Sequence, residues 1–250
     1  GYPLDKRIFP WNHANCGDLN LSGERRPQSY LRETLWSDAP VSHIVVTPPV
    51  PSFPLNPDKA DWSVWDFPDV VDHWNFPGYE GKKMTVSVYS NCEQVELFLN
   101  GESLGKQENT ADKKNTLVWE VPYAHGILKA VSYNKGGEVG TATLESAGKV
   151  EKIRLSADRT EIVADGNDLS YITLELVDSK GIRNQLAEEL VEFSIEGDAT
   201  IEGVGNANPM SIESFVANSR KTWRGSNLLV VRSGKSSGRI IVTAKVKALP

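Results

Sequence analysis

The stretch VELFLNGESLGK (95–106) decides the fold class of this chain. Its first run alternates, so Val95, Leu97 and Leu99 share one face of a β-strand. Asn100-Gly101 follows directly. An Asn-Gly pair between two strand-like runs is the strongest short-range hairpin signal, because both central turn positions need φ > 0. The stretch therefore predicts an antiparallel hairpin with one buried face.

The same alternation continues on both sides of this hairpin. The other period-two runs are HIVV (43–46), TVSVY (85–89), TLVWEV (116–121), ILKAVSY (127–133) and EVGTATL (138–144), and NKGG (134–137) supplies a second tight turn. We expect HIVV to pair as an edge strand. Together these runs predict an antiparallel β-sandwich over residues 41–147.

A second series of short strands follows a linker-like stretch at 145–152. Its members are IRLSA (153–157), EIVAD (161–165), YITLELVD (171–178), VEFSIEG (191–197), ATIEGVG (199–205), NLLVVRS (227–233) and GRIIVTAKV (238–246). Seven short alternating strands over about 100 residues fit an immunoglobulin-like sandwich. The chain is thus predicted to be mainly β, with a second, C-terminal sandwich over 148–250.

The segment before the first sandwich has a different pattern. PQSYLRETLW (27–36) predicts a helix with Pro27 at its first position, where a missing N–H has no cost, and with Tyr30, Leu31 and Leu35 on one stripe. Residues 38–57 contain six prolines, which exclude a helix interior or a central strand. We expect an extended connection there.

Composition narrows the class of partner. The chain has 250 residues, a net charge of −6, 39% hydrophobic and 24% charged residues, and a pI near 5.4. This acidic balance argues against nucleic acid or an anionic membrane surface as the main partner. No apolar run is long enough to span a membrane. Cys16 and Cys92 fall in different segments, so two free thiols are expected rather than a disulfide.

Aromatic residues gather at 61–79, where Trp62, Trp65 and Trp74 lie close in sequence. One interpretation is a platform on which sugar rings stack. The other is that these side chains fill a sandwich core or a domain interface, where aromatics bury much area per residue. The second interpretation is favoured, because a platform needs two or three rings in one plane.

Motifs that carry chemistry are scarce. There are 33 acidic residues, and no two of them stand out as a glycosidase pair. His13 and Cys16 make at most half a metal site, and a lone pair of this kind is usually structural. Residues 158–170 hold four carboxylates but miss the spacing of a calcium loop, so a solvated loop is favoured. The sequence predicts neither a cofactor nor a metal.

Four stretches carry a family resemblance. GDLNLSGERRPQSYLRETLW (17–36), YSNCEQVELFLNGESLGK (89–106), GDATIEGVGNANP (197–209) and RSGKSSGRIIVTA (232–244) resemble the C-terminal portion of family 2 glycoside hydrolases, the β-galactosidase group. The first looks like the last βα unit of that family's catalytic TIM barrel. The last two resemble its terminal immunoglobulin-like module, itself similar to invasin-type repeats. The resemblance assigns 1–40 to the end of the barrel and a linker.

The resemblance implies that both catalytic glutamates lie upstream of Gly1, so no catalytic residue is expected here. Trp11, Asn12, His13 and Asn15 would then be possible substrate-lining groups. The alternative, which is favoured, is a loose arm or packing on the first sandwich. A single βα unit cannot close a barrel, so the helix face formed by Tyr30, Leu31, Leu35 and Trp36 needs another partner. We expect it to dock on the first sandwich.

The leading functional hypothesis is therefore a non-catalytic accessory region of a β-galactosidase-like hydrolase, whose partners are an oligosaccharide or polysaccharide substrate and the missing catalytic barrel. The second hypothesis is a carbohydrate-binding module that uses Trp62, Trp65 and Trp74. A third, an adhesin-like spacer, is disfavoured by the barrel-like segment. The resemblance implies a periplasmic or secreted enzyme, with the cytoplasm and a homo-oligomer left open.

Overall fold

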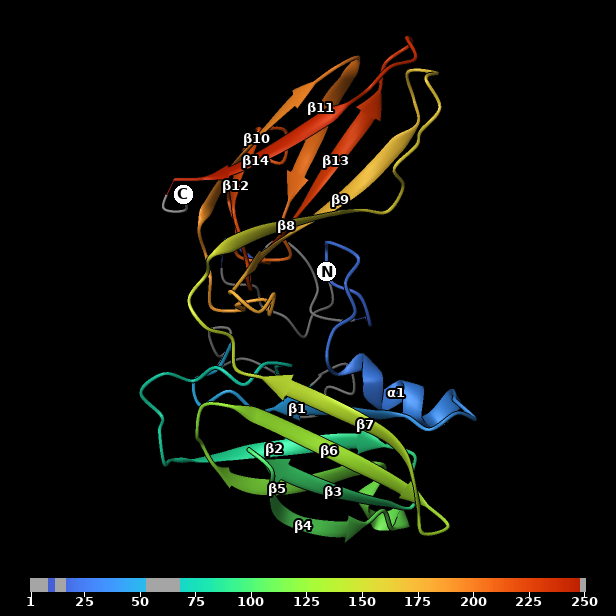
Figure 1. Ribbon diagram of the computed structural model, residues 1–250, viewed down its shortest axis with the longest axis vertical. Coiled ribbons are helices and arrows are strands. Elements are labelled where there is room, and N and C mark those ends of the chain that lie inside the picture. The colour runs from blue at the N-terminus through green and yellow to red at the C-terminus, as the bar shows by residue number, and fades with distance from the viewer. Residues whose placement is uncertain (1–8, 12–16, 53–67, 248–250) are drawn as a thin grey trace. The chain divides into compact units, whose positions relative to one another are not determined.

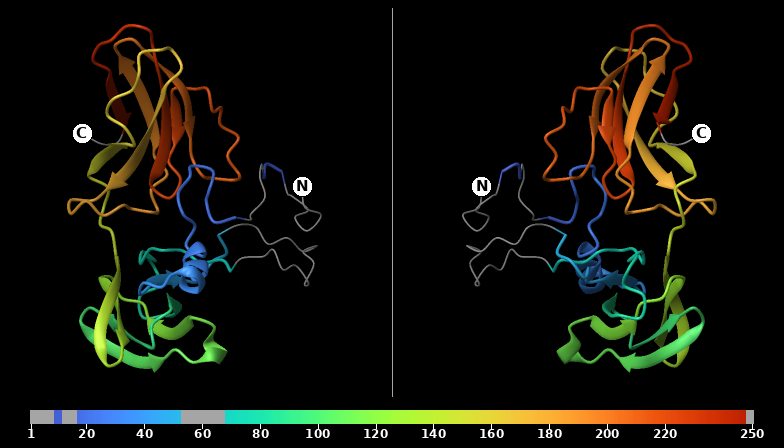
Figure 2. Two further views of the ribbon diagram at one scale, coloured as in Figure 1. Left: turned by 90° about the vertical axis from the view of Figure 1, so that its right-hand side faces the viewer. Right: turned by 90° about the vertical axis from the view of Figure 1, so that its left-hand side faces the viewer.

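The computed structural model describes residues 9–11, 17–52 and 68–247. Within these ranges the chain is mainly β, with one α-helix, one 3₁₀ helix and fourteen antiparallel strands. The described residues divide into two compact units: 17–20 with 25–146, and 9–11 with 21–24 and 147–247. Each unit is a sandwich of one three-stranded and one four-stranded sheet (Figures 1 and 2).

The first unit follows the alternation of its sequence. Its elements are α1 (Ser29–Trp36), β1 (Ser42–Val46), β2 (Lys83–Ser90), β3 (Gln94–Leu99), β4 (Glu102–Glu108), the 3₁₀ helix η1 (Ala111–Lys113), β5 (Thr116–Pro122), β6 (Ile127–Asn134) and β7 (Gly137–Glu145). One sheet has the order β1-β2-β5 and the other β4-β3-β6-β7. The predicted edge strand at 43–46 is confirmed as β1, which pairs with β2 as its one neighbouring strand in the sheet and forms an isolated bridge from Val46 to Val71.

The predicted Asn-Gly hairpin joins β3 to β4. Leu99 pairs with Glu102, and the two residues between them adopt positive φ, 53° at Asn100 and 89° at Gly101. This is the backbone that a two-residue hairpin requires. The Asn100 side chain also accepts a hydrogen bond of 2.8 Å from the N–H of Ile127, so the turn is tied to the start of β6.

Trp74 occupies the core of the first unit and is fully buried. Its ring meets Phe76 and Tyr123 edge-on, at centroid separations of 5.9 and 4.9 Å. Its Nε1–H donates to the carbonyl of Ala124 at 2.8 Å, so its one polar group is satisfied. Apart from Trp119 and Met84, the remaining core is aliphatic, and most of it comes from the inward face of every second residue in the strands.

Helix α1 docks on the first sandwich, as predicted. Tyr30 and Leu31 pack against a small cluster made of Val45, Val70 and Tyr89. The expectation for the end of the helix is wrong: Leu35 is 66% and Trp36 is 85% exposed. The buried residues of the helix are Ser29 and Thr34 and not the predicted apolar ones, so Leu35 and Trp36 lie outside its buried face.

The docked helix is fixed by a stack of side chains. The Tyr30 ring stacks on the imidazole of His43 at a centroid distance of 3.5 Å, and the Arg25 guanidinium lies over the Tyr30 ring, 3.9 Å from its centroid. Burial lowers the pKa of His43 to about 4; Asp72 and Glu33 oppose this shift and Arg25 adds to it. His43 is therefore neutral at pH 7.

The second unit contains β8 (Lys152–Ala157), β9 (Leu169–Val177), β10 (Leu190–Glu196), β11 (Ala199–Gly205), β12 (Ser219–Lys221), β13 (Ser226–Ser233) and β14 (Ile241–Val246). Its sheets have the orders β12-β10-β14 and β11-β13-β9-β8. The predicted strand EIVAD (161–165) is wrong, because this segment forms the loop between β8 and β9. Strand β12, three residues long, was not expected.

The start of the second unit is held by a buried carboxylate. Asp178 accepts hydrogen bonds from the N–H groups of Gly148 (2.8 Å), Lys180 and Ile182 (both 2.9 Å). It thereby joins the chain entering β8 to the turn after β9. Inside the sandwich, aliphatic residues and Phe193 form a continuous core.

Two other expectations concern the described part of the chain. No helix within it has the length and apolar character needed to cross a membrane. Cys92 is buried and carries a free thiol, whereas Cys16 lies outside the described residues.

We predict that Trp74→Ala lowers the free energy of unfolding of the first unit by about 3–5 kcal/mol, because it removes the largest buried side chain and leaves a cavity. Urea unfolding followed by tryptophan fluorescence and circular dichroism measures this. Trp36→Ala is the matched control and should change the same quantity by less than about 0.5 kcal/mol, since that ring is exposed. Equal effects of the two substitutions would contradict the burial of Trp74.

We also predict a pH dependence that originates at His43. Its pKa is about 4 in the folded chain against 6.5 for the free side chain. Between these values the unfolded chain binds a proton that the folded chain does not. Stability contributed by the neutral imidazole is thus complete above pH 6.5, falls as the pH decreases to 4, and amounts to about 3 kcal/mol.

The measurement is urea unfolding of the first unit at several pH values between 4 and 7. His43→Phe keeps a ring against Tyr30 but cannot titrate, so its stability should vary less with pH over this window than that of the unmodified chain. Identical pH profiles for the two proteins would show that His43 is not the origin.

Candidate functional site

Of the seven residues predicted to contact sugar, the structure describes two, Trp11 and Trp74, which belong to different units. Trp74 is buried in the core of the first unit and has no exposed face to offer a sugar ring. Trp11 is half-buried and belongs to the second unit. The other predicted residues, Asn12, His13, Asn15, Trp62 and Trp65, lie outside the described residues.

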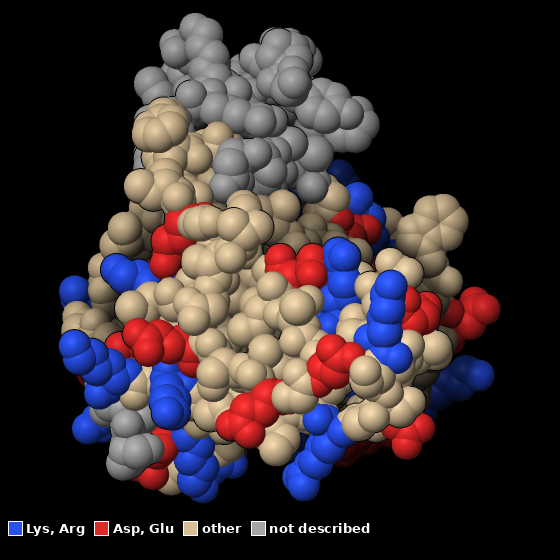
Figure 3. Space-filling model, turned by 90° about the horizontal axis from the view of Figure 1, so that it is seen from above, with Lys and Arg blue, Asp and Glu red and all other residues tan. Residues whose placement is uncertain are grey.

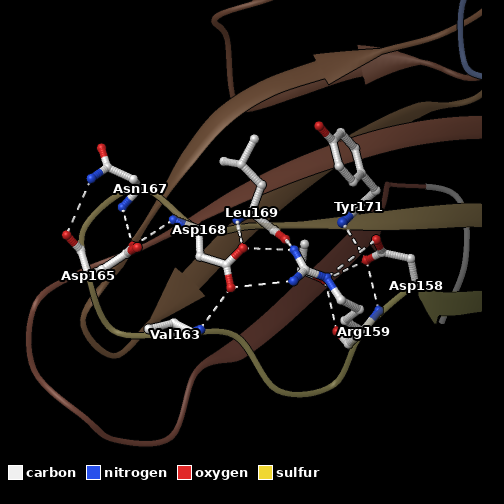
Figure 4. A network of polar contacts seen from close by, with 9 residues as sticks. Asp158, Arg159, Val163, Asp165, Asn167, Asp168, Leu169 and Tyr171 are labelled. Atoms are coloured by element: carbon white, nitrogen blue, oxygen red, sulfur yellow. Dashed lines mark hydrogen bonds and ion pairs between the residues drawn. The ribbon is translucent and has the colours of Figure 1, made fainter.

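Polar side chains do gather at the loop between β8 and β9 (Figure 4). The Arg159 guanidinium donates to Asp168 Oδ1 at 2.9 Å and also to the carbonyl of Leu169. Asp168 Oδ2 in turn accepts the N–H of Val163 at 2.8 Å. This arrangement fastens the middle of the loop to the start of β9.

The other two aspartates of the loop bind backbone N–H groups. Asp165 Oδ1 accepts those of Asn167 (2.7 Å) and Asp168 (2.8 Å). Asp158 Oδ1 accepts those of Arg159 and Tyr171, both at 2.8 Å, and the hydroxyl of Ser170 at 3.0 Å. The loop is therefore folded around its own carboxylates, which explains why EIVAD is not a strand.

These hydrogen bonds set the charge of the loop. The N–H groups of Tyr171, Asn167 and Val163 are the main causes that lower the pKa of Asp158, Asp165 and Asp168, respectively. All three are ionised at neutral pH. Most of their acceptor sites are occupied, so the loop is not arranged as a calcium clamp. No group of three or more His, Cys, Asp or Glu side chains suited to a metal occurs in the part of the chain that the structure describes.

The same observation bears on acid–base catalysis. A glycosidase needs one carboxyl group that stays protonated near neutral pH, which requires a raised pKa. Among the described residues, every carboxyl group with a shifted pKa is shifted downward: Asp112, Asp158, Asp165, Asp168, Asp178 and Asp198. Backbone and side-chain hydrogen bonds to the charged form produce these shifts. None of these groups suits the role of the acid.

A cavity of about 630 Å³ lies beside the loop, within the second unit. It is lined by Leu21, Ser22, Gly23, Ser156, Ala157, Asp158, Tyr171, Thr173 and Leu228. Sequence reasoning missed this site. The alternation of β9 indicates that Tyr171 and Thr173 face outward. Which residues of the adjacent strands lie beside them depends on strand register, which the sequence alone does not reveal.

Charge on the face shown in Figure 3 is mixed, with acidic and basic side chains interspersed. No broad area of a single sign covers that view. Such a surface does not provide the concentrated positive field that binding to a phosphate backbone requires.

A segment of each unit matches a known protein-family model. Residues 153–250 match the glycoside hydrolase family 2 C-terminal domain 5, and residues 81–140 match a domain of unknown function. Among curated proteins, the chain is 31% identical over 242 residues to the β-galactosidase BoGH2A of Bacteroides ovatus, covering 96% of this chain and 25% of that protein. It is 31% identical over 194 residues to a β-glucuronidase of Formosa agariphila, covering 75% of this chain and 19% of that protein.

Solved structures agree with these matches. A glycosyl hydrolase family 2 member from Bacteroides cellulosilyticus is 95% identical, with a TM-score of 0.90, over 95% of this chain and 31% of that chain. A β-glycosidase from Bacteroides vulgatus is 26% identical, with a TM-score of 0.78, over 94% and 27% of the respective chains. The chain thus spans between about a fifth and a third of these relatives.

We predict that millimolar Ca²⁺ leaves the thermal midpoint of the second unit unchanged, because the carboxylates of the 158–168 loop already bind N–H groups and Arg159. Asp168→Asn should lower the midpoint, since it weakens the ion pair with Arg159 and the bond to Val163. Differential scanning calorimetry with and without a chelator measures both. Glu161→Gln is the control, as this exposed side chain lies in the same loop but outside the network. Stabilisation by Ca²⁺ would contradict our assignment.

Proposed function

We propose that this chain, which belongs to the C-terminal region of glycoside hydrolase family 2, is the non-catalytic accessory region of a β-galactosidase-like enzyme. The observation that carries the proposal is the match of both units to relatives of which they form a minor part. The chain covers only a quarter of BoGH2A. The rest of such an enzyme would supply the chemistry.

The electrostatics of the described residues support this assignment. A retaining glycosidase places two carboxyl groups about 5 Å apart and keeps one of them protonated. The described carboxyl groups with shifted pKa values, Asp112 in the first unit and five aspartates in the second, all favour the charged form. We therefore propose that the two catalytic glutamates lie outside these 250 residues, in the catalytic domain of the longer enzyme.

The substrate is proposed to be a β-galactoside. The names of two relatives support this, BoGH2A and a β-galactosidase of Thermoanaerobacter pseudethanolicus that is 30% identical over 186 residues. Relatives from Formosa agariphila carry the name β-glucuronidase. The two substrates differ by the carboxylate at C6, so a comparison of neutral and anionic glycosides separates them.

The helical segment supports the structural part of the role. Helix α1 is attached to the first sandwich through Tyr30 and Leu31 while Leu35 and Trp36 remain exposed. We propose that this attachment lets the first unit buttress the catalytic domain of the longer enzyme. The alternative, a carbohydrate-binding module that uses the tryptophan cluster, is weakened because the ring of Trp74 is buried and inaccessible to a sugar.

We predict that the 250-residue chain does not hydrolyse 4-nitrophenyl β-D-galactopyranoside or the corresponding β-D-glucuronide. A polypeptide extended upstream to the length of the relatives should hydrolyse the galactoside with the higher kcat/KM. Release of nitrophenolate measures both. Turnover by the 250-residue chain that persists through repurification and scales with its concentration would refute the non-catalytic role. A preference of the extended protein for the glucuronide would refute the proposed substrate but not the accessory role.

A further inference from the structure

We propose that the cavity beside Tyr171 on the second unit is a binding site for a neutral glycosyl residue. The proposal goes beyond the accessory role, because it assigns a ligand to a surface that the family match does not address. It rests on three features: the row of side chains on the cavity floor, the exposed aromatic ring at its edge, and the charge of the adjoining loop.

The floor of the cavity is set by strand register. Ser156 of β8 pairs with Thr173 of β9, and Thr173 pairs with Leu228 of β13. Residues opposite one another in a sheet point to the same face. Since Ile172 and Leu174 on either side of Thr173 are buried in the core, this row faces outward. Two hydroxyl groups and one aliphatic side chain thus lie side by side.

The edge of the cavity is an exposed aromatic ring on a strand whose backbone is held in place. Tyr171 lies two residues before Thr173 on the same face of β9 and is 43% exposed. Its backbone is held from both sides: its N–H donates to Asp158 Oδ1 at 2.8 Å, and its carbonyl accepts the N–H of Asp158 at 2.9 Å. Figure 4 shows the ring projecting away from this network.

The remaining wall is a short turn of the second unit. Leu21 and Gly23 line the cavity, and the adjoining Glu24 forms an ion pair of 2.9 Å with Arg183 and accepts a hydrogen bond of 3.2 Å from the Ser226 hydroxyl. Gly23 has φ of +78°, which most side chains would resist. The two contacts of Glu24 attach the turn to the second sandwich.

The chemistry of these groups matches a sugar. A pyranose has an apolar face of C–H groups, which packs on a flat ring, and a rim of hydroxyls, which donate and accept hydrogen bonds. Tyr171, Leu21 and Leu228 provide apolar surface, and Ser156 and Thr173 provide hydroxyls. Asp158 adds a carboxylate whose Oδ2 lies 3.9 Å from the Arg159 Nε. A volume of about 630 Å³ falls within the range of small-ligand sites.

The negative charge of the 158–168 loop should distinguish neutral from anionic sugars. Residues 158–168 carry four acidic side chains and one basic one, and that base, Arg159, is engaged by Asp168. The hydrogen bonds that hold Asp158 keep it ionised. A uronate would place a second negative charge beside it, which is unfavourable. The site should therefore prefer a neutral galactoside to a glucuronide.

The test uses the 250-residue chain with methyl β-D-galactopyranoside, lactose and methyl β-D-glucuronide as probes. Saturation-transfer NMR detects contact, and calorimetric titration gives Kd. We expect both neutral glycosides to bind more tightly than the glucuronide. Tyr171→Ala should weaken binding about tenfold, the factor that loss of roughly 1.4 kcal/mol of ring contact produces. Tyr171→Phe, which keeps the ring, should bind as the unmodified chain does.

Two further variants guard against trivial results. Ser156→Phe places a bulky side chain that favours strands at an exposed position on the floor, so it should abolish binding without unfolding the unit. Trp36→Ala removes a more exposed ring outside the cavity and should leave Kd unchanged. Thermal midpoints confirm that each variant is folded.

Three outcomes would overturn the proposal: no contact of either neutral glycoside at millimolar concentration, binding that survives both Tyr171→Ala and Ser156→Phe, or tighter binding of the glucuronide. None of them bears on the proposed accessory role, which is judged by hydrolysis and not by binding.

Discussion

Burial of the Trp74 indole is the constraint on which the first unit depends. The residue lies outside the regular strands, yet its ring fills the core against Phe76 and Tyr123, and its Nε1–H requires the carbonyl of Ala124. The carbonyl of Trp74 also accepts the hydroxyl of Ser146, the last residue of the unit. One residue therefore connects the segment entering β2, the loop between β5 and β6, and the end of the first unit, the first two through its side chain and the last through its backbone carbonyl. An aromatic ring used in this way is lost to ligand binding.

In the second unit, polar groups hold the connecting segments in place. Arg220 on β12 is fully buried, with its guanidinium 4.2 Å from the centroid of the Phe215 ring and hydrogen bonds to the carbonyls of Val204 and Glu213 and to the Ser211 hydroxyl. Asp178 and the aspartates of the 158–168 loop act similarly on backbone N–H groups. These hydrogen bonds hold the loops without the use of a buried aromatic side chain. The ring of Tyr171 therefore remains at the surface.

The sequence predicted those features that depend on local pattern. Alternation gave the strands, and Asn100-Gly101 gave the hairpin, because each signal requires only neighbouring residues. EIVAD failed because alternation does not reveal whether a partner strand exists; here Asp165 and Asp168 satisfy nearby N–H groups, and no ladder forms. Trp36 and Trp74 could not be distinguished by composition, since one lies at the end of a helix stripe and the other in a core defined by distant strands. The cavity was unpredictable for the same reason: Ser156, Thr173 and Leu228 are brought into one row by the register of three strands.

A sandwich of this kind is physically better suited to binding than to proton transfer. Its inner faces are filled by aliphatic and aromatic side chains, which leaves no room for a carboxyl group to be buried without partners. Acidic residues are then restricted to outward strand positions, where water solvates them, or to loops, where unpaired backbone N–H groups stabilise their charged form. Both environments favour ionisation, and the downward pKa shifts of Asp158, Asp168 and Asp178 follow from the second. A general acid would need the opposite environment, an apolar pocket with few donors. None of the described carboxyl groups with a shifted pKa has such an environment, whereas the outer face of the second unit displays the hydroxyls of Ser156 and Thr173 and the ring of Tyr171.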